Sequence, residues 1–83
     1  MRLIFDTPAT EAIARMSEIP HELFTLECLD VGQAPRKQGS VIIGKTGMVT
    51  QLSRAVGSMG FIFYEVDDEA ATVTITSVIS VVD

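Results

Sequence analysis

The chain has 83 residues, of which 47% are hydrophobic, and a formal net charge of −5 at pH 7. This length suits a single domain, 1–83, and the apolar content is sufficient for a core, which excludes an intrinsically disordered chain. No apolar run approaches the ~18 residues of a membrane span, and Asp6 interrupts the place where an export signal would stay apolar. The negative charge argues against a general nucleic-acid binder. We therefore expect a cytoplasmic protein that contacts no membrane, and the charge disfavours nucleic acid as its partner.

The metal and redox chemistry open to this chain is narrow. Cys28 is the one cysteine, so no intrachain disulfide can form, and we interpret it as a small buried apolar residue in a reducing compartment. His21 is the one histidine and has no second His or Cys at metal-ligand spacing. We expect no metal site and no cofactor.

The first part of the chain predicts a strand followed by helix. Residues 2–5 are short and apolar, and the Asp-Thr-Pro segment after them is typical of a helix start. Apolar residues from Ala9 to Ile19 then recur every three or four positions, so we expect this helix to end near Pro20. Residues 21–31 fit both a strand and a helix, and a proline in the first turn favours a second helix.

The second half changes to a strand pattern. β-rich runs at 40–43, 48–54, 61–66 and 71–82 are separated by short glycine-containing or acidic turns. Connections this short favour hairpins. The predicted fold class is therefore α+β, with an N-terminal strand and one or two helices packed on a mainly antiparallel sheet of about four to five strands.

One segment matches the spacing of a phosphate-binding loop. Gly39 to Thr46 fits G-x-x-x-x-G-K-[ST], but its four intervening residues are Ser-Val-Ile-Ile, and a further strand pattern follows where a helix would begin. We interpret this segment as a strand entering a hairpin turn.

The charges are segregated along the sequence. All eleven acids lie in 1–30 and 65–83, whereas 31–64 contains Arg36, Lys37, Lys45 and Arg54 and no acid. These four residues are candidates for a face that binds an anion or an acidic partner. Alternatively, neighbouring strands and the acidic turn at 67–69 neutralise them within the fold.

Residues 48–78 resemble the C-terminal half of RelE/ParE-type toxins of bacterial toxin–antitoxin systems. The resemblance is carried by Phe61-Ile-Phe-Tyr64-Glu-Val-Asp-Asp68, followed by Ala71-Thr-Val-Thr-Ile-Thr-Ser-Val78. It implies a strand, a helical hairpin and an antiparallel sheet, and an antitoxin as partner. In the family an arginine commonly lies three residues before the tyrosine, and here that position is Phe61. Ribonuclease members also have basic or tyrosine residues near the C-terminus, whereas this chain ends Ile-Ser-Val-Val-Asp.

Three functional hypotheses follow. The first is a RelE/ParE-like protein that acts by protein–protein interaction with an antitoxin-like or target protein, without intact ribonuclease chemistry. The second is a small α+β protein of phage or mobile-element type that self-associates as a homodimer through its final strand. The third is an mRNA-cleaving ribonuclease toxin with Lys45, Arg54 and Tyr64 at the catalytic site.

Overall fold

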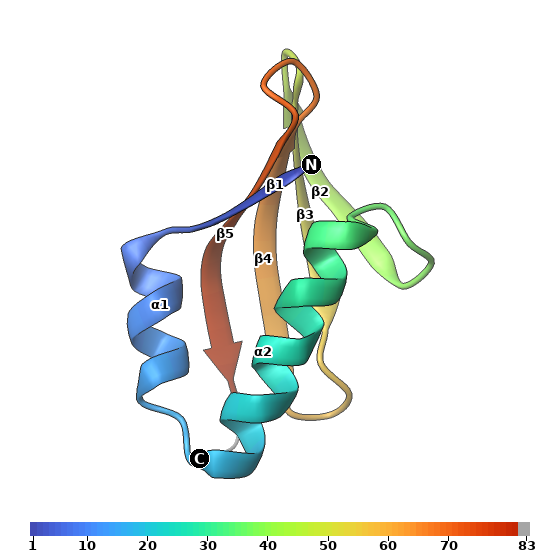
Figure 1. Ribbon diagram of the computed structural model, residues 1–83. Helices are drawn as coiled ribbons and strands as arrows, with labels where there is room; N and C mark the ends of the chain where they lie inside the picture. Colours follow the sequence, from blue (N-terminus) through green and yellow to red (C-terminus); the bar gives the residue numbers. More distant parts are fainter. Residues whose placement is uncertain (82–83) are drawn as a thin grey trace.

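The computed structural model describes residues 1–81 and shows two helices lying on one face of a five-stranded sheet (Figure 1). Residues 82 and 83, with the expected end of the last strand at Val82, lie outside the described part. The predicted α+β class is confirmed, with a second helix where the sequence pattern was ambiguous. The elements in chain order are β1 (Arg2–Phe5), α1 (Thr7–Ala14), α2 (Glu18–Gln33), β2 (Ser40–Thr46), β3 (Val49–Ala55), β4 (Gly60–Asp67) and β5 (Thr72–Ser80).

The strand order in the sheet is β1-β5-β4-β3-β2. Strands β2 to β5 form an antiparallel meander, as the short connections predict, because each hairpin returns the chain beside itself. Strand β1 instead pairs in parallel with β5, and the helices lie in the chain between β1 and the meander. The outermost strands are therefore β1 and β2, and β1 covers only Thr72–Ile75 of the final strand.

The first helix begins where the sequence predicts, but the boundary between the two helices lies earlier in the chain than predicted. Asp6 precedes α1 and Pro8 lies in its first turn, where a proline needs no hydrogen-bond partner for its nitrogen. The helix ends at Ala14 rather than near Pro20, because Ser17 takes an extended conformation and becomes the residue before α2. Pro20 therefore lies in the first turn of the second helix. No helix in residues 1–81 is long and apolar enough to cross a membrane.

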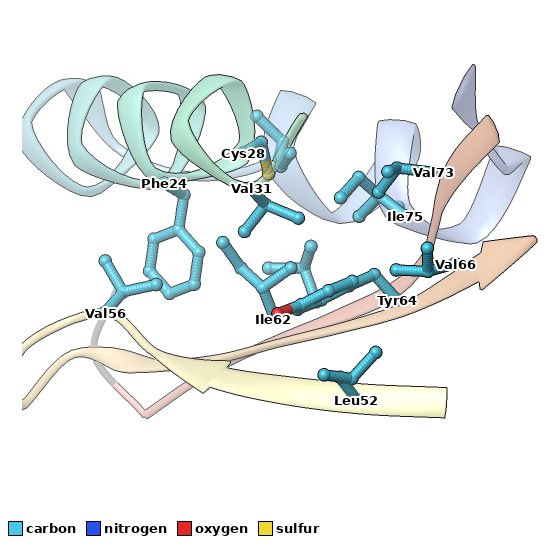
Figure 2. Packing of buried hydrophobic residues seen from close by; sticks show 13 residues of the cluster. Phe24, Cys28, Val31, Leu52, Val56, Ile62, Tyr64, Val66, Val73 and Ile75 are labelled. Atoms are coloured by element: carbon cyan, nitrogen blue, oxygen red, sulfur yellow. The ribbon is translucent and has the colours of Figure 1, made fainter. Parts of the chain in front are cut away.

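The core lies between the helices and the face of the sheet that they cover (Figure 2). Every second residue of β4 points into it, so Ile62, Tyr64 and Val66 are buried while their neighbours are not. Phe24 and Val31 meet them from α2. Burying each such side chain contributes about 1.5–3 kcal/mol to folding. The remaining buried hydrophobic residues are Ala9, Ile13, Cys28, Leu52, Val56, Val73, Ile75 and Val78.

Candidate partner-binding surface

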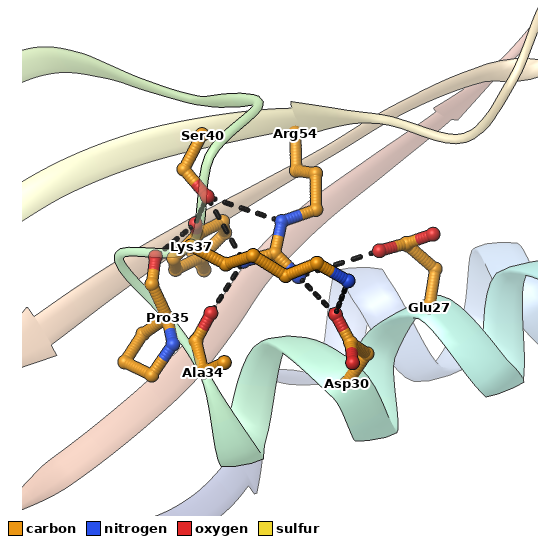
Figure 3. Close-up of polar contacts among 8 residues, drawn as sticks. Glu27, Asp30, Ala34, Pro35, Lys37, Ser40 and Arg54 are labelled. Carbon is orange, nitrogen blue, oxygen red and sulfur yellow. Dashed lines mark hydrogen bonds and ion pairs between the residues drawn. The ribbon is translucent and has the colours of Figure 1, made fainter.

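Arg54 on β3 is the centre of a polar network that joins the sheet to α2 and to the loop after it (Figure 3). Its Nη1 donates to Asp30 Oδ2 at 2.8 Å and to Glu27 Oε2 at 3.3 Å, both on α2. Its Nη2 donates to the Ala34 carbonyl oxygen, and Nε and Nη2 donate to Ser40 Oγ at 3.1 and 2.9 Å. Only 5% of the residue is exposed. These contacts make Arg54 an anchor of the fold, since each guanidinium nitrogen already has a partner.

Tyr64 lies beside this network and holds the same loop. Its hydroxyl donates to the Pro35 carbonyl oxygen at 2.5 Å and lies 2.9 Å from Ser40 Oγ. The Arg54 Cζ atom lies 5.9 Å from the centroid of the tyrosine ring, a cation–π distance. The side chain is 1% exposed. The hydroxyl thus fixes the connection between α2 and β2 and is closed to a large substrate.

The other three candidate cations, Arg36, Lys37 and Lys45, differ in whether and with which acid they form an ion pair. Lys37 Nζ contacts Asp30 Oδ2 at 3.1 Å, and Arg36 Nη2 contacts Asp68 Oδ2 at 2.9 Å. Lys45 is exposed on β2 and makes no ion pair within residues 1–81. Acids from α2 and from the turn before β5 therefore meet three of the four cations that stand together in the sequence.

The carboxylate of Asp30 is shared between Arg54 and Lys37. The hydrogen bond from Lys37, with the charges of Lys37 and Arg54, holds the pKa of Asp30 below its ordinary value. Two positive and two negative side chains, counting Glu27, balance at this point. Sequence reasoning selected Arg54 but missed Ser40, Glu27 and Asp30. The available signal was that Arg54 occupies an inward position between Leu52 and Val56, where a cation needs buried partners.

For the predicted catalytic set, the structure brings Arg54 and Tyr64 together and leaves Lys45 outside. Lys45 lies opposite Thr50 in the β2–β3 hairpin, and no contact joins it to the Arg54 network. Gly44, Lys45 and Thr46 belong to β2, and only two residues separate β2 from β3. This region is a hairpin, as the sequence predicted, and no helix begins there to receive a phosphate.

The outward side of α2 carries exposed large aliphatic residues. Phe24, Cys28 and Val31 fill the inner side, as expected for a helix packed on a sheet. Four further aliphatic side chains are exposed by 41–68%: Ile19, Leu23, Leu26 and Leu29. A helix on the surface of an isolated domain is normally polar on that side, so this pattern marks a surface that can be covered. We call these four residues the α2 stripe.

An open groove runs beside the stripe, between α2 and the turn from β3 to β4. Its volume is about 440 Å³. Its lining is mixed: aliphatic side chains of α2 and of the turn lie beside charged groups of the Arg54 network. The lining residues are Leu23, Leu26, Glu27, Asp30, Lys37, Val56, Gly57 and Met59.

The face of the sheet that the helices leave uncovered has a smaller apolar row. Phe61 is 45% exposed and Ile79 is 50% exposed, and they are paired in register on β4 and β5. Ala55 lies on the other side of Phe61. Phe61 is the position at which the resemblance to RelE/ParE-type toxins implies an arginine, so this chain has an apolar side chain there.

Cys28 and His21, the one cysteine and the one histidine of the chain, have structural contacts. Burial raises the pKa of the Cys28 thiol to about 12, with a smaller contribution from the charge of Glu27, so the reactive thiolate is absent at neutral pH. The Nδ1 atom of His21 lies 2.9 Å from the Ile13 carbonyl oxygen and ties α2 to α1. No group of three or more His, Cys, Asp or Glu side chains within residues 1–81 is arranged to hold a metal ion.

Comparison with known proteins gives structural matches only. No protein-family model and no curated protein sequence matches the chain. The RelE–RelB complex of Pyrococcus horikoshii OT3 contains a chain with a TM-score of 0.74 at 15% identity, covering 95% of this chain and 92% of that one. The isolated RelE toxin of E. coli gives 0.72 at 22% identity, with 95% and 82% covered. The intact E. coli RelBE toxin–antitoxin complex gives 0.72 at 21% identity, with 99% and 98% covered. The chain has the fold of the RelE-type toxins.

Proposed function

We propose that this protein acts by binding a protein partner of the antitoxin type, and that the α2 stripe and its groove form the binding surface. The exposed aliphatic stripe is the observation that carries the proposal. Two of the three structural matches are complexes of RelE with RelB or its archaeal counterpart, so a protein partner is in keeping with the fold. The proposal concerns this chain's own surface, because the matches share no more than 22% of its residues.

The burial pattern of α2 favours an outward side that is covered by a partner over one that stays in contact with water. Leu26 and Leu29 are each more than half exposed, although the opposite side of the helix is already filled by Phe24 and Cys28. Full burial of an exposed leucine is worth about 1.5–3 kcal/mol, so covering one that is already half-buried gains about half of that. A partner segment lying along the helix and entering the groove beside Leu23 would bury the stripe.

The charges on α2 define the chemistry of that segment. Glu18 and Glu22 flank Ile19 and make no ion pair within residues 1–81, and α2 has no lysine or arginine. The whole chain carries −5. We infer that the segment is apolar with lysine or arginine beside its apolar residues, because opposite charge favours encounter and register.

The same geometry supports the absence of ribonuclease chemistry at the predicted residues. General acid–base catalysis needs side chains within hydrogen-bond reach of the reacting groups. The Tyr64 hydroxyl and the Arg54 guanidinium are buried and fully engaged, and Phe61 brings no charge to the uncovered face. The family that the sequence resembles includes ribonuclease members, so the ribonuclease hypothesis needs a test of its own.

The binding test uses the product of the short reading frame next to this gene as the candidate partner. Titration calorimetry would compare the parent with a variant carrying Leu23→Gln and Leu26→Gln. We expect affinity to fall at least about tenfold, equivalent to ~1.4 kcal/mol, because both residues line the groove. Met48→Gln is the control, since Met48 is 53% exposed in the turn between β2 and β3, away from the stripe. Equal affinity for the parent and the double variant would contradict the proposed surface.

The second test separates binding from ribonuclease action. Expression of the chain without its partner should leave cellular mRNA intact under this proposal. Growth arrest with mRNA cleavage that is lost in Lys45→Gln, a substitution at an exposed residue, would overturn it and favour the third hypothesis. Lys45 suits this test because, unlike Arg54 and Tyr64, it can be replaced without removing a core contact.

A further inference from the structure

Strand β2 is an edge of the sheet (Figure 1). It carries an apolar segment that is exposed to solvent. Val41, Ile42 and Ile43 are 57%, 66% and 56% exposed. They are consecutive, so apolar side chains leave the strand on both faces. The other edge strand, β1, has only four residues.

Exposed edges of this kind are normally blocked. An edge strand has backbone N–H and C=O groups without partners on its outer side, and proteins usually place charges, prolines or covering elements there. Within β2 the one charged residue is Lys45, and there is no proline. The β-bulge between Ile42 and Gly44 is the remaining irregularity, and it shortens the segment that can pair.

The charge distribution identifies which protein can approach this edge. Two copies of a chain with net charge −5 repel each other over most of their surfaces. The stretch from Val31 to Tyr64 contains no acid, and β2 lies within it. The edge is therefore the part of the sheet where two copies meet with the least repulsion. The Arg54 network accounts for only part of the charge segregation in the sequence. The absence of acids around β2 would also reduce repulsion between two copies at this edge.

We propose that β2 pairs antiparallel with β2 of a second copy, joining two five-stranded sheets into one. A two-fold axis at Ile42 places Ile42 opposite its counterpart and Val41 opposite Ile43, so apolar side chains meet across the axis. Lys45 falls opposite Gly39 of the second copy. The two lysines are then about 20 Å apart, at ~3.3 Å per residue, which exceeds the Debye length of about 8 Å at physiological salt. This register has no like charges in contact.

Strand β1 pairs only with Thr72–Ile75 of the final strand β5, and β4 occupies the other side of β5, so the self-association through the final strand that the sequence predicted could use only its last part. Strand β2, with seven residues and no strand on its outer side, offers the longer free edge. A short pairing segment predicts a dimer at the weak end of specific interfaces.

The experiment is sedimentation velocity of the purified chain from about 1 μM to about 1 mM, which spans weak and moderate dissociation constants. We expect a concentration-dependent monomer–dimer equilibrium. Ile42→Lys should weaken it at least about tenfold, because it places paired charges at the axis. Ile19→Lys is the matched control: Ile19 is 68% exposed on α2, and its replacement should leave the equilibrium unchanged.

A second measurement is independent of any variant. Amide hydrogen exchange of the parent should show residues 41–45 gaining protection as concentration rises, while α2 does not. A chain that stays monomeric throughout, or a dimer that survives Ile42→Lys, would overturn the proposal. So would loss of the dimer in Ile19→Lys, which would assign self-association to the α2 stripe. If the chain is monomeric and Ile42→Lys instead abolishes binding of the neighbouring gene's product, the edge receives a partner strand rather than a second copy.

Discussion

Arg54 and Asp30 are 24 residues apart in the chain, and the Nη1 of Arg54 lies 2.8 Å from the Asp30 Oδ2. This contact joins strand β3 to the C-terminal half of α2. The side chain of Arg54 is 6% exposed and that of Asp30 is 37% exposed, so the pair lies at the boundary of the core with the carboxylate still reached by water. The arginine found by sequence as a binding candidate is thus a link between structural layers.

Replacing Arg54 by Leu should destabilise the fold by about 2–4 kcal/mol, because Asp30, Glu27 and Ser40 lose a charged donor in a largely buried place. Urea unfolding would measure the change. Arg36→Leu is the control: its ion pair with Asp68 is exposed on both sides, and the cost should be within about 0.5 kcal/mol. Equal effects of the two substitutions would show that the Arg54 network adds nothing beyond a surface pair.

Removing one oxygen in Tyr64→Phe tests the loop contact separately. The variant keeps the ring in the core but loses the hydrogen bond to the Pro35 carbonyl, and we expect a loss of about 1–2 kcal/mol. Amide exchange should become faster in residues 34–39 and stay unchanged in α1. Uniform acceleration across the chain would mean that the hydroxyl contributes to global stability without holding this loop.

The sequence predicted the elements better than their contacts. Strand β4 was recognisable as a β-rich run at 61–66 between a glycine-containing turn and an acidic turn, because these signals are local in the chain. The helical character of α2 was ambiguous since apolar residues occur on both of its sides, and one set is exposed. The contacts of Arg54 could not be predicted, because its acids come from a helix 24 and 27 residues away and packing alone brings them together. The fold also brings acids from α2 and from the turn before β5 beside three of the four cations of the basic run.

The free energy of unfolding should decrease at acidic pH because Asp30 becomes protonated. Its folded-state pKa is lower than the ordinary value of 3.8, so its stabilising contribution is fully present above that value and is lost as pH falls through the folded pKa. Parent and Asp30→Asn should therefore differ in urea midpoint at pH 7 and converge at acidic pH, below the folded pKa. A difference that persists unchanged at the lowest pH would assign the effect to packing and not to the charge.

Gly60 is expected to tolerate no side chain. Its φ is +153°, and a Cβ there would run into the Ile79 carbonyl oxygen and lie 2.9 Å from the Phe24 ring. Gly60→Ala should cost about 3 kcal/mol or more, since backbone and core both resist the shift. Gly57→Ala is the control: its φ is +53° with no atom within 4 Å of the added carbon, so only backbone strain of about 1–2 kcal/mol applies. Thermal unfolding of both variants would show whether the packing contact decides the outcome.

Replacing the exposed cations distinguishes an apolar, basic partner segment from an acidic one. Arg36, Lys37 and Lys45 can be replaced together by Gln with little effect on stability, and Arg54 is left intact because it anchors the fold. If the partner segment is apolar and basic, its affinity should stay within about threefold or become tighter, because each lost surface pair is worth less than ~1 kcal/mol and Asp30 loses a competing cation. Calorimetric titrations at low and moderate salt would measure this. A tenfold loss, with a weaker dependence of affinity on salt, would instead show that an acidic segment binds these three residues, as their run in the sequence first predicted.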